Sequence, residues 1–83
     1  MAKGTIRYWA AAKDASGVAE EPFEAATLAE LMANVTAGRA ELARVVRRSS
    51  FLVDGHPVGR RAHEEVVLAE GVTVEVLPPF AGG

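Results

Sequence analysis

The chain has 83 residues, which is enough for one small domain. Nine basic and eleven acidic side chains give a formal net charge of −2, which does not suggest general nucleic-acid binding. The sequence contains no cysteine, and this excludes structural disulfides, a cysteine nucleophile, a cysteine-ligated metal and thiol redox chemistry. It shows no signal-peptide pattern and no apolar run near the roughly 20 residues that span a bilayer, so we expect a soluble cytoplasmic domain.

The first 25 residues predict two strands. Hydropathy alternates over residues 6–10, the period of a half-buried strand, so Tyr8 and Trp9 should face opposite sides, one in the core and one exposed. Residues 13–17 are interpreted as a turn or loop. A second strand is predicted over residues 19–24 with Phe23 pointing inward. Because Pro22 cannot donate to a hydrogen-bond ladder, this strand is expected at a sheet edge.

Two helices are predicted next. Thr27 and Glu30 have the spacing of a capping box, in which each side chain accepts a hydrogen bond from a free backbone amide. One apolar stripe follows at helical spacing and consists of Leu28, Leu31, Met32 and Val35. Gly38 is placed to end this helix in a left-handed conformation. A shorter helix over residues 39–47 would have Leu42, Val45 and Val46 on one face.

The remaining third of the chain returns to strand patterns. Residues 51–53 lead into Asp54-Gly55, a two-residue hairpin signal, and residues 59–65 are interpreted as a polar loop. Residues 66–68 fit a short irregular turn, and residues 72–77 alternate as a strand. The order strand, strand, helices, strand, strand, strand predicts one α+β domain, a mixed sheet of about five strands with helices on one face.

The chain ends in Pro78-Pro79-Phe80-Ala81-Gly82-Gly83, its most informative segment. Two prolines cannot continue a ladder and hold the backbone extended, so these six residues could reach roughly 20 Å beyond the fold. Two final glycines leave the terminal carboxylate with no side chain around it, the narrowest probe that a polypeptide can form.

A small strand–strand–helix–strand domain with this terminus resembles the ubiquitin-like β-grasp sulfur carriers of the MoaD/ThiS type. Among them it is most similar to the molybdopterin synthase small subunit (MoaD). The resemblance implies a β-grasp roll over residues 1–77 and a flexible C-terminal Gly-Gly tail over residues 78–83. The tail carries the specific part of the resemblance, and the rest of the chain matches by pattern.

The same resemblance implies the chemistry of the tail. A ubiquitin-activating-type adenylating enzyme (MoeB/ThiF-like) would use ATP to adenylate Gly83, and sulfur from a donor would convert it to a thiocarboxylate. The molybdopterin synthase large subunit (MoaE-like) would receive that sulfur. Gly82 and Ala81 would pass through the partner's narrow channel, and Pro78, Pro79 and Phe80 would anchor the tail. The chain itself would bind no cofactor and would be non-catalytic alone.

Two departures from the family pattern leave open which biosynthetic pathway the carrier serves. Leu77 replaces an aromatic residue common before the prolines, and Phe80 is larger than the valine or isoleucine common there. Related carriers serve cysteine, thiamin or tRNA thiolation. A ubiquitin-like modifier that forms isopeptide bonds through Gly83, and a non-covalent module with an inert tail, are the alternatives from other classes.

Other polar clusters have simpler interpretations. Six arginines fall within residues 39–61, a solvated surface or a docking patch for an acidic partner: Arg39, Arg44, Arg47, Arg48, Arg60 and Arg61. His56 and His63 lack a second ligand at metal-site spacing, and we expect neither to bind metal. No phosphate-binding glycine loop is present, so the chain alone should not bind ATP.

Overall fold

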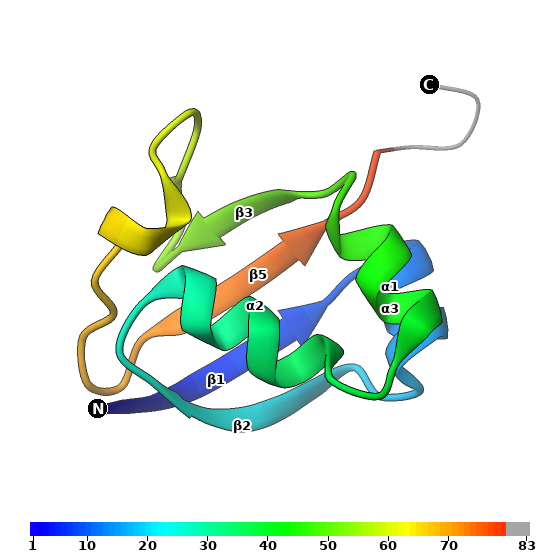
Figure 1. The fold of residues 1–83 in the computed structure, drawn as a ribbon, viewed down its shortest axis with the longest axis horizontal. Coiled ribbons are helices and arrows are strands. Elements are labelled where there is room, and N and C mark those ends of the chain that lie inside the picture. Colours follow the sequence, from blue (N-terminus) through cyan, green and yellow to red (C-terminus); the bar gives the residue numbers. More distant parts are fainter. Residues whose placement is uncertain (80–83) are drawn as a thin grey trace.

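The computed structural model describes residues 1–79, and Phe80 to Gly83 lie outside the described residues (Figure 1). The described chain forms strands β1 (Ala2–Tyr8), β2 (Glu20–Ala25), β3 (Ser50–Val53), β4 (His56–Pro57) and β5 (Thr73–Leu77). Its helices are α1 (Ala10–Ser16), α2 (Leu28–Thr36) and α3 (Ala40–Val46), with a single 3-10 turn, η1 (His63–Glu65). None of these helices is long and apolar enough to cross a bilayer.

The five strands form one mixed sheet in the order β2-β1-β5-β3-β4. β1 runs parallel to β5 and antiparallel to β2, whereas β3 runs antiparallel to both β5 and β4. The last strand is therefore the central one, and α2 crosses the face of the sheet that is turned toward the viewer in Figure 1. This arrangement confirms the predicted α+β fold, a β-grasp roll with helices on one face.

One apolar core joins that face of the sheet to the helices. Ile6, Val74 and Val76 project inward from β1 and β5 and are fully buried, and Leu31 and Leu42 from α2 and α3 cover them. At roughly 25 cal/mol per Å² of apolar area, each such side chain contributes about 1.5–3 kcal/mol. The buried apolar residues of the described chain belong to this single cluster.

The amino-terminal hairpin largely matches the prediction. β2 is an edge strand that contains Pro22, and Phe23 is buried against the core. β1 begins four residues earlier than the hydropathy pattern indicated, because its first half pairs with β2. On its other side, where β1 meets the start of β5, Gly4 lies so close to Val72 that a Cβ there would clash with the Val72 carbonyl oxygen.

The predicted loop at residues 13–17 is wrong. Residues 10–16 form the helix α1, which ends at Gly17 with φ +82°, and the Gly17 amide donates to the Lys13 carbonyl oxygen. The turn-forming residues Asp14 and Ser16 suggested a loop, but a run of alanines at residues 10–12 favours helix. Ala12 is fully buried in the core, so tertiary packing stabilises a helix too short to form alone.

The two later helices confirm their predictions. Thr27 Oγ1 accepts a hydrogen bond from the Glu30 amide at 3.2 Å, but the Glu30 carboxylate binds the amide of Ala26 and not that of Thr27. The capping box is therefore shifted by one residue on its second bond. Gly38 has the expected left-handed φ of +71°. Leu42 and Val46 are buried, and Val45 packs partly buried against them.

The predicted hairpin between β3 and β4 is also confirmed. Asp54 and Gly55 both have positive φ, +48° and +80°, as a type I′ turn requires. The loop that follows contains η1, and Val67 forms an isolated antiparallel bridge with Thr27. The segment that follows η1 is thus hydrogen-bonded to the start of α2.

Candidate functional site at the end of the central strand

The tail begins at the end of the central strand of the sheet. β5 pairs with β1 over residues 73–76 and with β3 over residues 74–77. Both of its edges are therefore hydrogen-bonded. Val74 and Val76 are fully buried beneath α2. Strand pairing stops at Leu77, immediately before the two prolines, which cannot donate to a ladder. The sheet therefore fixes the point from which the tail departs.

Three other segments meet at the end of the sheet where β5 stops. β1 is parallel to β5 and ends beside it, so Trp9 follows at the same end of the sheet. The Trp9 amide donates to the Val76 carbonyl oxygen at 3.2 Å. α1 starts there, and α3 ends there, because β3 begins opposite Leu77. The root of the tail is thus bordered by two helix termini (Figure 1).

Where α1, α3 and the prolines meet, they enclose a small notch. It has a volume of about 140 Å³ and is lined by Ala11, Val45, Arg48, Pro78 and Pro79. The notch is mostly apolar and has one cation at its rim. Pro79 is exposed and Pro78 is half-buried, so the tail leaves the protein surface progressively over these two residues.

On the opposite, open face of the sheet, an aromatic side chain lies beside the same strand. Trp9 is 42% exposed, and its Nε1 donates to Glu75 Oε2 at 2.9 Å. The Arg7 guanidinium lies 5.0 Å from the centroid of the Trp9 ring, within cation–π range. As predicted, one of the two neighbouring aromatic residues lies in the core and the other is exposed; the structure shows that Tyr8 is the buried one and that Trp9 lies just beyond the strand.

A partly buried polar network stabilises the end of β1. The Tyr8 hydroxyl donates to Glu21 Oε2 at 2.5 Å, and Arg39 donates to both oxygens of the same carboxylate at 2.8 and 3.2 Å. Hydrogen bonding from Arg39 lowers the pKa of Glu21, and burial raises the pKa of Tyr8. This network ties β1 and the edge strand β2 to the segment between α2 and α3.

Of the predicted tail residues, the structure places Pro78 and Pro79. Phe80, Ala81, Gly82 and Gly83 lie outside the described residues, so their predicted roles remain predictions. Within the arginine cluster, Arg39 and Arg44 bind carboxylates of Glu21 and Glu41. His63 packs edge-to-face on Phe51 with ring centroids 5.1 Å apart. Residues 1–79 contain no group of three side chains that could hold a metal ion.

The sequence analysis missed two features of the site. It did not foresee that α1 and the end of α3 flank the root of the tail, since it assigned α1 to a loop. The alanine run followed by Gly17 is the signal that could have indicated this helix. It also did not connect Tyr8, Glu21 and Arg39, because no local pattern relates residues 31 positions apart.

The comparisons with known proteins agree with this geometry. The model of the ThiS family matches residues 6–83, which includes the central strand and the whole tail. The chain belongs to the ThiS family. This ThiS-family protein is therefore a β-grasp sulfur carrier or small modifier. No curated protein matches its sequence.

Solved structures share the fold of this ThiS-family protein at low sequence identity. The small archaeal modifier protein 1 (SAMP1) from Methanosarcina acetivorans is 20% identical and has a TM-score of 0.86, with 100% of this chain and 98% of that chain covered. SAMP1 from Haloferax volcanii is 18% identical with a TM-score of 0.78, covering 98% and 99%.

A third similar structure comes from a complex of two proteins. It is the complex of subunits 1 and 2 of the molybdopterin-converting factor from Helicobacter pylori, with 20% identity, a TM-score of 0.73 and coverage of 98% and 99%. These similarities establish the fold of the ThiS-family protein.

Proposed function

We propose that this protein is a cytoplasmic sulfur carrier whose terminal Gly83 becomes a thiocarboxylate, and that it serves as the small subunit of molybdopterin synthase. The observation that carries the proposal is a Pro-Pro-Phe-Ala-Gly-Gly terminus that follows the central, doubly paired strand of a ThiS-family fold. Residues 1–77 are the folded domain in this proposal, and residues 78–83 are the tail that enters the partners.

The proposed chemistry follows from the nature of a terminal carboxylate. With a pKa near 3.5 it is ionised at neutral pH and is a poor electrophile. Attack of its oxygen on the α-phosphate of ATP forms an acyl-adenylate and releases pyrophosphate. A sulfur nucleophile then attacks the carbonyl carbon and forms a C–S bond, while AMP leaves with the electrons of the broken C–O bond. Where the donor is a persulfide, a thiol must reduce the resulting acyl disulfide.

The protein contributes presentation to this chemistry, and its partners contribute catalysis. A ubiquitin-activating-type enzyme supplies ATP and the sulfur donor, and a molybdopterin synthase large subunit receives the sulfur. Gly82 and Ala81 have little or no side chain, so a narrow channel can admit them up to Phe80. Because both edges of β5 are paired, the strand that carries the tail is already ordered before binding, which limits the entropic cost of association.

The decisive experiment is mass spectrometry of the intact chain after incubation with a cognate activating enzyme, ATP and a sulfur donor. We expect a mass increase equal to the difference between sulfur and oxygen. A chain that lacks Gly83 should show none, and Lys3→Ala, a surface change at the opposite end of the sheet from the tail, should react as the unaltered chain does. Persistence of the shift in the truncated chain would refute Gly83 as the acceptor.

The pathway is tested by the identity of the partner. Co-purification with a molybdopterin synthase large subunit supports the proposal, whereas co-purification with an enzyme of cysteine, thiamin or thiolated-tRNA synthesis refutes that part of it.

The structural similarity of this chain to two archaeal modifier proteins supports a second candidate function, that of a protein modifier. That candidate predicts higher-mass conjugates in cell extracts that disappear when Gly82 and Gly83 are deleted.

A further inference from the structure

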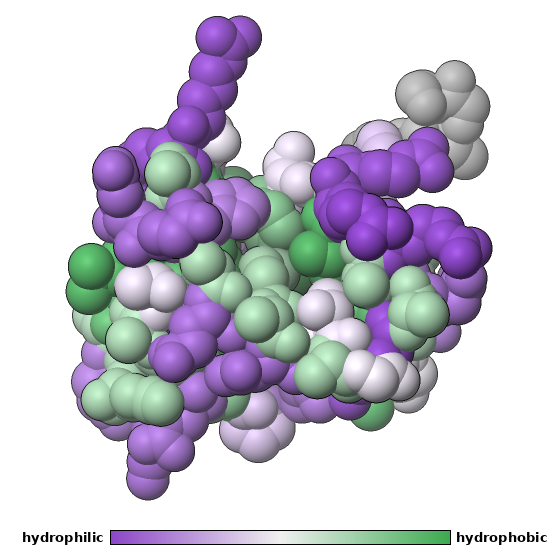
Figure 2. Space-filling model, viewed as in Figure 1, coloured by the Kyte–Doolittle hydropathy of each residue, from purple (hydrophilic) through white to green (hydrophobic). Residues whose placement is uncertain are grey.

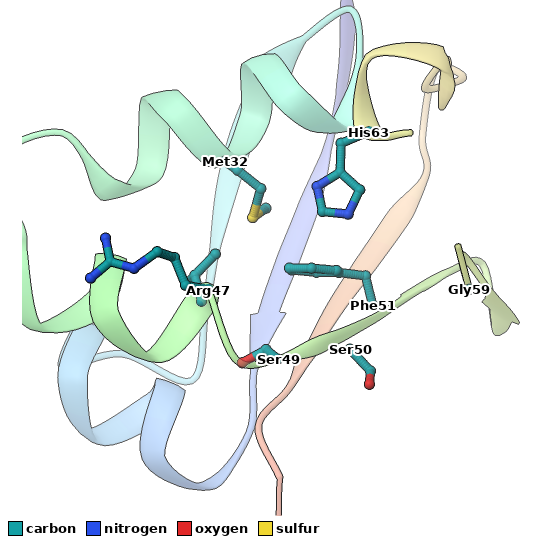
Figure 3. A pocket seen from close by; sticks show the side chains of 8 residues that line it. Met32, Arg47, Ser49, Ser50, Phe51, Gly59 and His63 are labelled. Atoms are coloured by element: carbon teal, nitrogen blue, oxygen red, sulfur yellow. The ribbon is translucent and has the colours of Figure 1, made fainter. Parts of the chain in front are cut away.

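A cleft with an apolar floor lies between α2, α3 and β3, on the helix-covered side of the sheet. It has a volume of about 460 Å³, within the range of ligand-binding pockets. Met32, Phe51 and His63 converge on it from three different elements (Figure 3). Met32 and Phe51 are core residues whose outer surfaces form the floor, and His63 packs edge-to-face on Phe51. The cleft therefore offers a preformed aromatic and thioether surface.

The rim of this cleft is polar and cationic. Arg47, Ser49 and Ser50 line it on the side of α3 and β3, and no carboxylate is among its lining residues. Glu64 and Glu65 follow His63 in η1, but neither lines the cleft. An occupant that carries negative charge would thus meet the Arg47 side chain at the rim without facing a carboxylate among the lining residues.

Further arginines extend this positive charge beyond the cleft. Arg47 and Arg48 follow α3, and Arg60 and Arg61 lie in the loop after β4, all four exposed. None of the four has a carboxylate within 4 Å in residues 1–79, in contrast to Arg39 and Arg44. Figure 2 shows hydrophilic side chains on both sides of a hollow of mixed hydropathy, over the loop after β4 and over the end of α3.

We propose that this cleft, flanked by Arg47 and Arg48 on one side and by Arg60 and Arg61 on the other, binds an acidic peptide segment of a partner protein. One large apolar side chain of that segment sits on Phe51 and Met32, and carboxylates on either side of it meet the arginines. A small organic anion could use Arg47 alone. An extended chain with several carboxylates can reach all four arginines, and charge complementarity therefore selects a peptide.

The position of the cleft relates this binding to the tail without depending on it. Ser50 pairs with Leu77, the last residue of the central strand, and Arg48 lines the notch beside Pro78 and Pro79. A segment in the cleft would therefore approach the root of the tail from the helix side of the sheet. Binding here requires neither Gly83 nor its activation, so failure of this proposal leaves the sulfur-carrier proposal intact.

The test is a titration of the full-length, isotope-labelled protein with a synthetic pentapeptide, followed by NMR. The peptide has a central phenylalanine between aspartates and glutamates. We expect saturable shifts of the Met32 methyl group and of the Ser49, Phe51 and His63 amides. Replacing the phenylalanine by alanine should weaken binding about tenfold, and Arg47→Glu or Arg60→Glu should each weaken it about fivefold.

Matched controls make the result decisive. Lys3→Glu changes the net charge equally, at an exposed side chain at the start of β1 that alternates away from the core, and should leave the dissociation constant within about 1.5-fold at physiological salt. Equal weakening by Lys3→Glu would show unspecific charge attraction and would overturn the proposal. So would shifts confined to the open face of the sheet, phenylacetate binding as tightly as the peptide, or no shifts at millimolar peptide.

Discussion

The network of Tyr8, Glu21 and Arg39 makes the strongest prediction about stability, and Glu21→Ala tests it. The substitution removes two hydrogen bonds from Arg39 and the acceptor of the Tyr8 hydroxyl. The Tyr8 residue is 2% exposed, and its hydroxyl loses its acceptor at a partly buried position. An unsatisfied buried hydroxyl costs about 1–3 kcal/mol. The ion pair adds less than a buried one because the Arg39 side chain is 37% exposed.

We therefore expect Glu21→Ala to lower the free energy of unfolding by about 2–3 kcal/mol. For a domain of this size that corresponds to a fall in Tm of about 10–20 °C, measurable by circular dichroism during heating or in urea. The matched control is Glu20→Ala on the same strand. Glu20 contacts Arg7 at 3.5 Å with both side chains about half exposed, and its loss should cost under about 0.5 kcal/mol.

The pH dependence of this effect has a definite sign. Hydrogen bonding from Arg39 lowers the folded-state pKa of Glu21, so the ionised carboxylate stabilises the fold. That contribution is complete above the unfolded-state pKa of about 4.3 and is lost as the pH falls through the lower folded-state pKa. The stability difference between the unaltered chain and Glu21→Gln should therefore shrink below about pH 4. Equal losses for Glu20→Ala and Glu21→Ala, or a difference that grows toward low pH, would refute the reasoning.

Four further substitutions test the packing of the folded domain, each measured by urea denaturation. Gly4→Ala would force a Cβ against the Val72 carbonyl oxygen and should cost about 2–4 kcal/mol, whereas Gly71→Ala, with φ +81° but open space, should cost only about 1–2 kcal/mol; a reversed order contradicts the close approach. Thr27→Ala removes the cap that accepts the Glu30 amide and should cost about 1 kcal/mol, and an unchanged midpoint would show that water replaces it. Leu42→Ala empties a fully buried site under α3 and should cost about 2–5 kcal/mol; a cost below about 1 kcal/mol would mean that α3 collapses onto the sheet.

Local sequence patterns predicted the structure correctly at positions where a residue type has one structural role. The hairpin at Asp54-Gly55 was predictable because the type I′ turn needs two residues that tolerate positive φ. The cap at Thr27 and the edge position of Pro22 followed from equally local rules about amide donors. The alternation of β5 indicated a strand, although its central position came from the order of the sheet as a whole.

The features that the sequence did not predict depend on contacts between distant segments. α1 is stabilised by burial of Ala12 and by contact with α3, and the sequence of the seven helical residues contains no information about these contacts. The notch at Pro78 and the cleft over Phe51 each join segments separated by many residues, so their lining depends on tertiary packing. The sequence indicated that a tail exists, and the surroundings of its root came only from the fold.

The double pairing of β5 also determines how the molecule responds to force on its carboxyl end. A partner that grips the tail and pulls along the strand loads the ladders to β1 and β3 in shear, so their hydrogen bonds share the load at once. An edge strand pulled in the same direction would have a single ladder to carry that load. Since forced unfolding is governed by the unfolding barrier, the domain should withstand threading and withdrawal of its tail without losing the last strand.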